Sequence, residues 1–197
     1  MKQSSNIILM VHGITDTGNI FNDMASYFEK KGYKIYTIDL IPNLGTADLR
    51  DLAQQLKTYI DTQFLPQEKI ILLGFSMGGL VTRYYLQRLN GLERIDRYIS
   101  ISAPNNGTNL AYTLPLEGIM QMRPNSEFLQ DLNKDIKETL GQIKSLILWT
   151  PFDAMIIPAN SSLLSIGKEV NIPVLFHKWM LFDQRVYDEI DSFLKGT

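Results

Sequence analysis

The stretch Lys69-Ile-Ile-Leu-Leu-Gly-Phe-Ser-Met-Gly-Gly-Leu80 decides how this chain is interpreted. Its first part, Lys69–Leu73, is a short apolar run typical of a strand covered on both faces. The run leads into Gly74-Phe75-Ser76-Met77-Gly78, a G-x-S-x-G pattern, and then into a predicted helix. A serine on so tight a strand-to-helix turn has a strained backbone and an exposed hydroxyl, and it requires small neighbours. A phosphate-binding turn is disfavoured, because neither G-x-G-x-x-G nor a P-loop lysine accompanies the pattern.

Similar runs recur on both sides of this stretch. Continuous apolar segments that predict further buried strands are Asn6–Val11, Lys34–Ile38, Ile95–Ile101, Lys144–Trp149 and Ile172–Phe176. Helix-period segments alternate with them at 18–31, at 49–64 with Thr46 as N-cap, at 77–90 with Gly91 as the stop, and after Asp183. This alternation predicts the α/β class, with a parallel sheet of about six strands and helices on both faces.

The predicted domain organisation is simple. We expect residues 1–197 to form a single domain, because the length suits one core and no boundary is visible. The segment at about 103–140 lacks a clean period and holds Pro115 and Pro124, so we expect it to cover one end of the sheet. One helix is predicted there, near Ser126–Leu132.

Composition excludes several kinds of function. The chain has no cysteine, which rules out disulfides and thiolate nucleophiles, and its net charge of −2 gives no basic surplus for nucleic acid. No apolar stretch approaches the length of a membrane-spanning helix, and Ile7–Val11 is too short for the core of a signal peptide. We therefore expect a cytoplasmic protein with no integral membrane segment.

A reactive serine needs a base, and the base needs an orienting group. Of the two histidines, His177 follows the last predicted strand and can reach over the sheet edge, whereas His12 is expected to hold its own loop. Asp153 follows the fifth predicted strand and precedes an apolar stretch, which gives the chain order Ser, Asp, His. Asp39 is the main rival as orienting group, and Asp183 is more simply a helix cap.

Acyl transfer also needs donors for the developing oxyanion. We predict the backbone N–H of Met77, directly after the serine, and that of Ile14, in the loop His12-Gly13-Ile14-Thr15 after the first strand. Gly13 would let this loop pass close to the substrate.

Taken together, these motifs resemble the small bacterial lipases and esterases of the α/β-hydrolase superfamily, in particular the compact, lipase A-like type. The resemblance rests on Val-His-Gly-Ile at 11–14, Gly-Phe-Ser-Met-Gly-Gly at 74–79, Asp153 before Ile-Ile-Pro, and the late His177. It implies a minimal α/β-hydrolase fold, with Ser76 as nucleophile, Asp153 and His177 as its partners, and Ile14 and Met77 as oxyanion donors. The chain departs from the family at Phe75 and Asn105, where these enzymes often carry histidine.

The predicted function is hydrolysis of carboxylic esters through an acyl-enzyme, without metal or organic cofactor. The expected partner is a small ester, with no nucleic acid and with the oligomeric state left open. Thioesterase, amidase or acyltransferase chemistry on the same three residues is one alternative, and a ligand-binding protein without turnover is another. Apolar residues between Leu110 and Met122 either line an acyl groove or pack over the sheet. The absence of a long cap predicts an open site for short-to-medium acyl esters.

Overall fold

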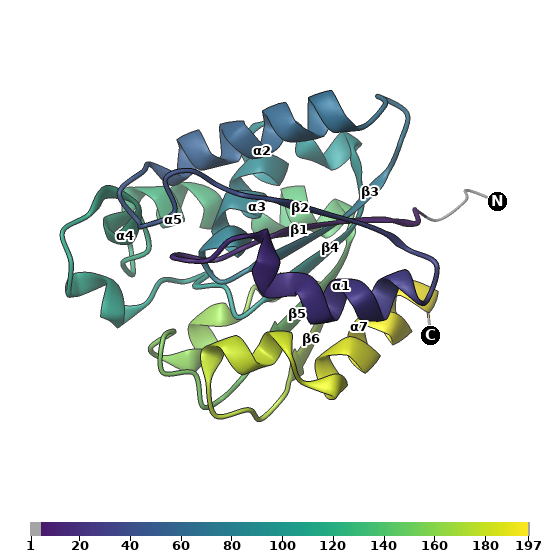
Figure 1. The fold of residues 1–197 in the computed structure, drawn as a ribbon. Coiled ribbons are helices and arrows are strands. Elements are labelled where there is room, and N and C mark those ends of the chain that lie inside the picture. Colours follow the sequence, from purple (N-terminus) through teal and green to yellow (C-terminus); the bar gives the residue numbers. More distant parts are fainter. Residues whose placement is uncertain (1–4, 197) are drawn as a thin grey trace.

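The computed structural model describes residues 5–196 and contains one six-stranded sheet (Figure 1). All neighbouring strands are parallel, in the order β2-β1-β3-β4-β5-β6. The strands are β1 Ile7–Val11, β2 Lys34–Ile38, β3 Ile70–Phe75, β4 Ile95–Ile101, β5 Lys144–Trp149 and β6 Lys168–Asn171. The predicted α/β class and the parallel six-stranded sheet are confirmed.

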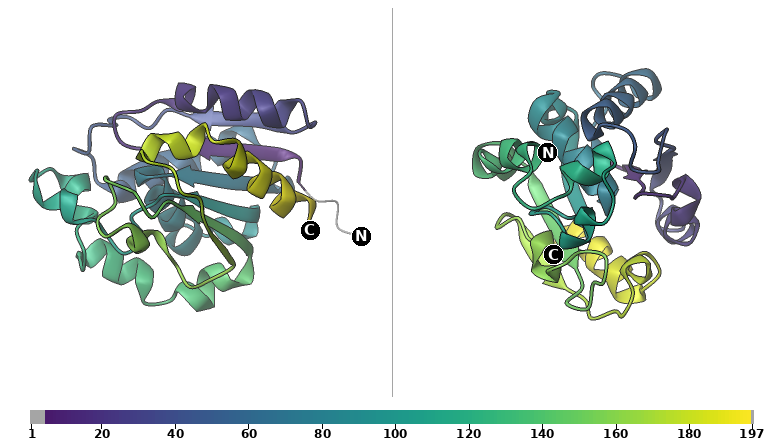
Figure 2. Two further views of the ribbon diagram at one scale, coloured as in Figure 1. Left: turned by 90° about the horizontal axis from the view of Figure 1, so that it is seen from below. Right: turned by 90° about the vertical axis from the view of Figure 1, so that its left-hand side faces the viewer.

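Helices cover both faces of the sheet (Figures 1 and 2). The α-helices are α1 Asn22–Glu29, α2 Leu49–Gln63, α3 Met77–Arg88, α4 Glu117–Gln121, α5 Glu127–Asn133, α6 Ile136–Thr139 and α7 Gln184–Lys195. Short 3-10 helices span Gly18–Phe21, Gly91–Glu93, Asn109–Tyr112, Leu140–Gln142, Ala159–Ser162 and His177–Leu181.

Strand β1 shows why its sequence is apolar throughout. Ile7, Leu9 and Val11 pack with α2 and α3, whereas Ile8 and Met10 pack with α1 and α7 on the other face. Because side chains alternate across a strand, burial on both faces removes every polar position. The same reasoning accounts for β3, which is buried along its whole length.

Two helix ends differ from the prediction. Helix α2 is capped by Asp48, whose side chain accepts a hydrogen bond from the N–H of Arg50 at 2.7 Å, so the assignment of Thr46 as N-cap is wrong. Asp48 directly precedes the helix, so its carboxylate can accept from the free N–H groups of the first turn. Thr46 lies two residues further from the helix. Helix α3 ends one turn before Gly91, and Asn90 takes the left-handed conformation expected of a stop residue.

The last strand is also displaced from its predicted position. Lys168–Asn171 pairs with β5, and the predicted segment Ile172–Phe176 follows it as irregular chain. Strand β6 lies at the edge of the sheet and is mostly exposed, so it lacks the apolar run that marks an inner strand. Ile172 and Val174 are apolar because they enter the core as the chain leaves the sheet.

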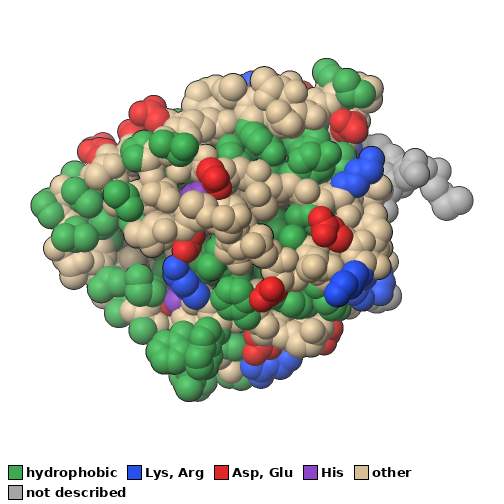
Figure 3. Space-filling view, in the orientation of Figure 1, with side chains coloured by type: hydrophobic (Ala, Val, Ile, Leu, Met, Phe, Trp, Pro, Cys, Tyr) green, Lys and Arg blue, Asp and Glu red, His purple; other side chains and the backbone are tan. Residues whose placement is uncertain are grey.

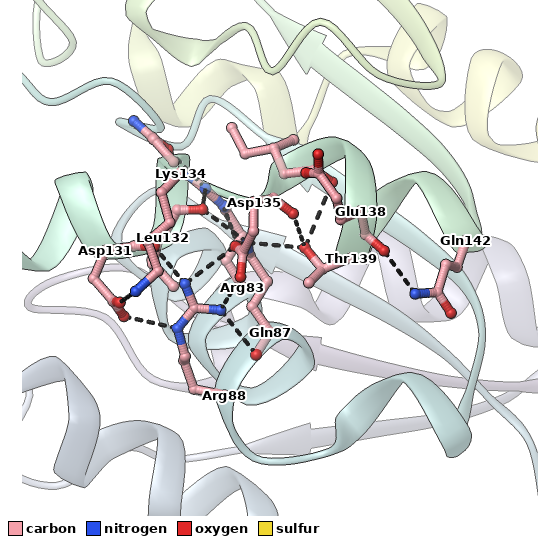
Figure 4. Close-up of polar contacts among 12 residues, drawn as sticks. Arg83, Gln87, Arg88, Asp131, Leu132, Lys134, Asp135, Glu138, Thr139 and Gln142 are labelled. Atoms are coloured by element: carbon pink, nitrogen blue, oxygen red, sulfur yellow. Dashed lines mark hydrogen bonds and ion pairs between the residues drawn. The ribbon is translucent and has the colours of Figure 1, made fainter.

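The segment 103–140, here called the covering segment, begins where the strands end, and its later part runs along α3, to which it is fastened (Figure 4). Arg83 is fully buried and donates to the carbonyl oxygens of Asn105 and Leu132 at 3.1 and 3.2 Å. Burial lowers the pKa of Arg83 to about 10, so its guanidinium remains charged at neutral pH. Arg88 pairs with Asp131 at 2.7 Å and with Asp135 at 2.9 Å.

Within residues 5–196, no helix combines the length and the apolar character needed to cross a membrane. The cytoplasmic location stays a prediction.

Candidate active site

Ser76 occupies the junction between β3 and α3. Its backbone has φ 53° and ψ −127°, a conformation that non-glycine residues adopt only under strain, and its N–H donates to the carbonyl of Ile101 at 2.9 Å. The strand, the sharp turn and the helix predicted from the sequence are all present. The side chain therefore stands at the carboxyl edge of the sheet, with the amino terminus of α3 directly behind it.

The turn fits only because Gly78 has no side chain. A Cβ atom at this position would collide with the carbonyl oxygens of Val11 and His12 at the end of β1. The first turn of α3 thus packs directly on the backbone of the neighbouring strand. This close approach fixes the serine turn against the loop that follows β1.

The loop after β1 lies beside the serine and is fixed by His12. A Cβ atom on Gly13 would stand 3.0 Å from Cβ of Ser76. The buried imidazole of His12 accepts from the N–H of Leu40 at 2.9 Å through Nε2, and its Nδ1 lies 2.8 Å from the carbonyl oxygen of Gly13. These bonds orient the peptide that carries the Ile14 N–H.

The N–H groups of the two residues predicted as oxyanion donors lack backbone acceptors among the described residues. Among the described residues, no hydrogen bond joins the N–H of Ile14 to another backbone group. Met77 is the first residue of α3, so its N–H has no acceptor within the helix. Two unpaired donors next to one serine can stabilise negative charge on a carbonyl oxygen.

His177 and Asp153 form a buried pair. His177 Nδ1 lies 2.7 Å from Asp153 Oδ2, and the two side chains are 7% and 1% exposed. The other carboxylate oxygen accepts from the N–H groups of Met155 and Ile156 at 2.9 and 3.0 Å. Because a carboxylate can only accept, the neutral imidazole carries its proton on Nδ1, and Nε2 is then the nitrogen that can take a proton.

His177 and Ser76 line the same cavity. His177 Nε2 is buried without a hydrogen-bond partner among the described residues, and both Ser76 and His177 line a cavity of about 350 Å³. The ring of Phe75 packs 4.9 Å from the imidazole, between centroids. No hydrogen bond joins the Ser76 hydroxyl to the imidazole within residues 5–196. Such bonds are often long without substrate and shorten in the complex.

The rival orienting group lies elsewhere. Asp39 accepts a hydrogen bond from the N–H of Gly18 at 2.6 Å, at the start of the 3-10 helix Gly18–Phe21. Asp183 caps α7 by accepting from the N–H of Arg185 at 2.9 Å. The structure therefore brings Asp153, and neither of these, to the imidazole.

The sequence did not reveal the residues that tie these loops together. The hydroxyl of Thr150, directly after β5, donates to the carbonyl of Val174 at 2.7 Å. It thereby links the loop that carries Asp153, here called the acid loop, to the loop that carries His177, here called the histidine loop. Lys178 Nζ lies 2.5 Å from Oδ1 of the buried Asp16, which joins the histidine loop to the loop after β1. Thr150 directly follows a predicted strand, which is a weak signal for a residue at the site. Nothing in the sequence indicates that Asp16 and Lys178, which are far apart in the chain, form a pair.

The covering segment contributes a second cavity beside Ser76. It has a volume of about 180 Å³, and Leu110, Leu114, Ile119 and Met122 line it. Leu116, by contrast, packs against the core. Some residues of this segment thus line a groove at the serine, and others pack over the sheet.

We find no group of three or more His, Asp or Glu side chains placed to hold a metal ion in the part of the chain that the structure describes.

Comparison with known proteins shows the family of this chain. A family model described as alpha/beta hydrolase fold matches residues 6–123, more than half of the chain. The chain is 23% identical over 206 residues to palmitoyl-protein thioesterase 3 of Dictyostelium discoideum, covering 80% of this chain and 69% of that protein.

Solved structures show the same fold. The mature lipase BlEst2 of Bacillus licheniformis superposes with a TM-score of 0.78 at 16% identity, over 98% of this chain and 93% of that one. Lipase B of Aspergillus fumigatus gives a TM-score of 0.78 at 15% identity, over 98% of this chain and 53% of that one. At such identities the likeness concerns the fold alone.

The packing of Gly78 gives a first prediction. We expect Gly78→Ala to lower the free energy of unfolding by about 2 kcal/mol or more, because the added methyl group overpacks against the end of β1. Gly141→Ala is the matched control, since nothing lies within 4 Å of a Cβ atom there. Urea unfolding of both variants measures the difference. Equal stability of the two would show that the turn tolerates a side chain at 78.

Proposed function

Because the chain belongs to the alpha/beta hydrolase fold family, we propose that it is a serine hydrolase that cleaves carboxylic esters through an acyl-enzyme. The observation that carries the proposal is the buried His177–Asp153 pair, because His177 lines the same cavity as the serine on the strained turn and its Nε2 has no hydrogen-bond partner among the described residues. A buried imidazole held by a carboxylate beside a strained serine has the composition that acyl transfer requires.

In this mechanism the Ser76 oxygen attacks the ester carbonyl as His177 Nε2 takes the hydroxyl proton. The N–H groups of Ile14 and Met77 stabilise the oxyanion of the tetrahedral intermediate. When the intermediate collapses, the carbon–oxygen bond to the leaving group breaks and His177 returns the proton to that oxygen. Water then repeats the cycle on the acyl-enzyme, and Asp153 remains the acceptor for Nδ1 throughout.

Removal of the nucleophile tests the proposal. We expect Ser76→Ala to reduce kcat/KM for p-nitrophenyl esters by about 10⁴-fold or more and to abolish labelling by a fluorophosphonate, because the attacking oxygen is gone. Ser165→Ala, at an exposed serine, is the control and keeps both properties. Unlabelled wild-type protein would favour a ligand-binding protein without turnover. Activity that survives in Ser76→Ala would overturn the assignment.

The orienting role of Asp153 is tested separately. Asp153→Asn keeps the shape of the side chain but replaces the acceptor of the Nδ1 proton, so we expect kcat to fall by about 10³- to 10⁴-fold. Asp39→Asn is the matched variant at the rival position and is expected to change kcat less than about threefold. If the two substitutions changed kcat equally, Asp153 would have no special role.

A second candidate is thioester hydrolysis, favoured by the similarity to a protein named as a palmitoyl-protein thioesterase. The same three residues serve both reactions, but an alcohol needs a proton from a general acid such as His177 in order to leave, whereas a thiol needs it less, so a bound general acid benefits ester cleavage more. We expect a hexanoyl ester to be cleaved with a kcat/KM at least equal to that of its matched thioester. A thioester preference of more than about tenfold would favour the second candidate.

A further inference from the structure

Two cavities meet at Ser76, and they differ in their walls. The cavity of about 180 Å³, here called the segment cavity, is walled by the covering segment. The cavity of about 350 Å³, here called the histidine cavity, contains His177. Ile14, Ser76 and Met155 line both, whereas His177 lines only the second. A carbonyl carbon attacked by Ser76 thus lies at the junction, with one space on either side.

We propose that the segment cavity receives the acyl group of the substrate, and that the histidine cavity receives an uncharged, flat aromatic leaving group. This inference rests on the proposed ester hydrolysis. Its first step is the path of the proton. When the carbon–oxygen bond breaks, its electron pair stays on the leaving oxygen, and the proton on His177 Nε2 moves to that oxygen. The leaving group must therefore occupy the cavity that contains His177.

The segment cavity suits an acyl chain without polar substituents. Its lining is apolar apart from Ser76 and two threonines, and both threonine hydroxyls are engaged. Thr108 donates to the carbonyl of Met155, and Thr113 donates to the carbonyl of Leu110, each at 2.8 Å. A polar group on the acyl chain would lose water without gaining a partner there. The small volume limits the acyl group to short or medium length.

The histidine cavity opens beside two exposed aromatic rings. Phe176 and Trp179 both line it, yet they remain 56% and 49% exposed. Their ring centroids lie 4.5 Å apart at 76°, so the rings form a corner. A flat ring placed in this corner can stack on one ring and meet the edge of the other, which are the two arrangements that aromatic groups prefer.

The charges in the histidine cavity argue for a neutral leaving group. Among the residues that line it, Lys178 is the one lysine or arginine, and its ammonium group is already paired with Asp16 at 2.5 Å. An anionic leaving group would have to compete with that carboxylate for the ammonium group.

The surroundings of the site are apolar as well. Apart from Leu65, every large hydrophobic side chain that is exposed among the described residues follows the carboxyl end of a strand. Figure 3 shows such side chains gathered at the left-hand and lower left ends of the molecule, where the strands of Figure 1 end. A bulky apolar leaving group therefore meets an apolar surface as it enters and leaves.

The test is a matrix of four esters, the acetates and hexanoates of methanol and 2-naphthylmethanol, each assayed below its solubility limit. Comparing each variant with the wild type on the same ester cancels the intrinsic reactivity of that ester. We expect Trp179→Ala to lower kcat/KM about tenfold for both naphthylmethyl esters and less than about twofold for the methyl esters. Leu114→Ala is expected to lower kcat/KM about three- to tenfold for both hexanoates and to spare the acetates.

Phe182→Ala is the matched control, because Phe182 is 45% exposed in the same region but lines neither cavity. It is expected to leave all four esters within about twofold of the wild type. If Trp179→Ala affected methyl and naphthylmethyl esters equally, or if the two variants exchanged their patterns, the assignment of the cavities would be wrong.

A binding measurement separates this inference from the proposed function. In Ser76→Ala protein, calorimetric titration should show 2-naphthylmethanol binding about tenfold more weakly once Trp179→Ala is added, with cyclohexylmethanol little changed. If the wild type cleaved esters but this binding difference were absent, the proposed aromatic leaving-group site would be wrong and the proposed ester hydrolysis would stand. The binding difference without any ester turnover would support the aromatic site and overturn the hydrolase.

Discussion

The close contact between the first turn of α3 and the end of β1 is the constraint on which the site depends. Chain order changes direction at β1, because β2 is added on one side of it and β3 on the other. Such switch points leave a crevice at the carboxyl ends of the strands. Here Gly78 lets the backbone of α3 pack directly against the carbonyl groups of Val11 and His12. Ser76, the Met77 N–H and the Ile14 N–H are brought together by that single approach.

The inner part of this arrangement could be predicted from the sequence because it is governed by local physics. Strands buried on both faces require continuous apolar runs, and a tight strand-to-helix turn requires glycine, so β1, β3 and the serine turn leave strong signals. The edge strand β6 gives only a weak sequence signal, because Lys168–Asn171 is mostly exposed. The cap at Asp48 was missed because several residues before α2 have suitable side chains, and only the path of the backbone selects one.

The connections between loops could not be predicted, because they join residues that are distant in sequence and of ordinary type. Thr150 links two loops through one hydroxyl, and Lys178 meets Asp16 across the site. Arg83 is a further case, since a cationic side chain on a helix is normally exposed. Its burial is stabilised because the carbonyl groups of Asn105 and Leu132 in the covering segment accept hydrogen bonds from the guanidinium. The position of that segment then follows from polar bonds to α3 as well as from apolar packing.

The acid loop shows how orientation of the imidazole and shape of the site are coupled. Asp153 holds His177 with one oxygen and the N–H groups of Met155 and Ile156 with the other. The same carboxylate therefore folds the turn that places Met155 between the two cavities. The carbonyl of Met155 in turn accepts from Thr108 of the covering segment. A shift of the covering segment would thus reach the imidazole through only two hydrogen-bonded residues. The shape of the segment cavity and the orientation of the imidazole therefore depend on the same hydrogen bonds. A substitution near Thr108 that reshapes the segment cavity is expected to change the orientation of the imidazole as well.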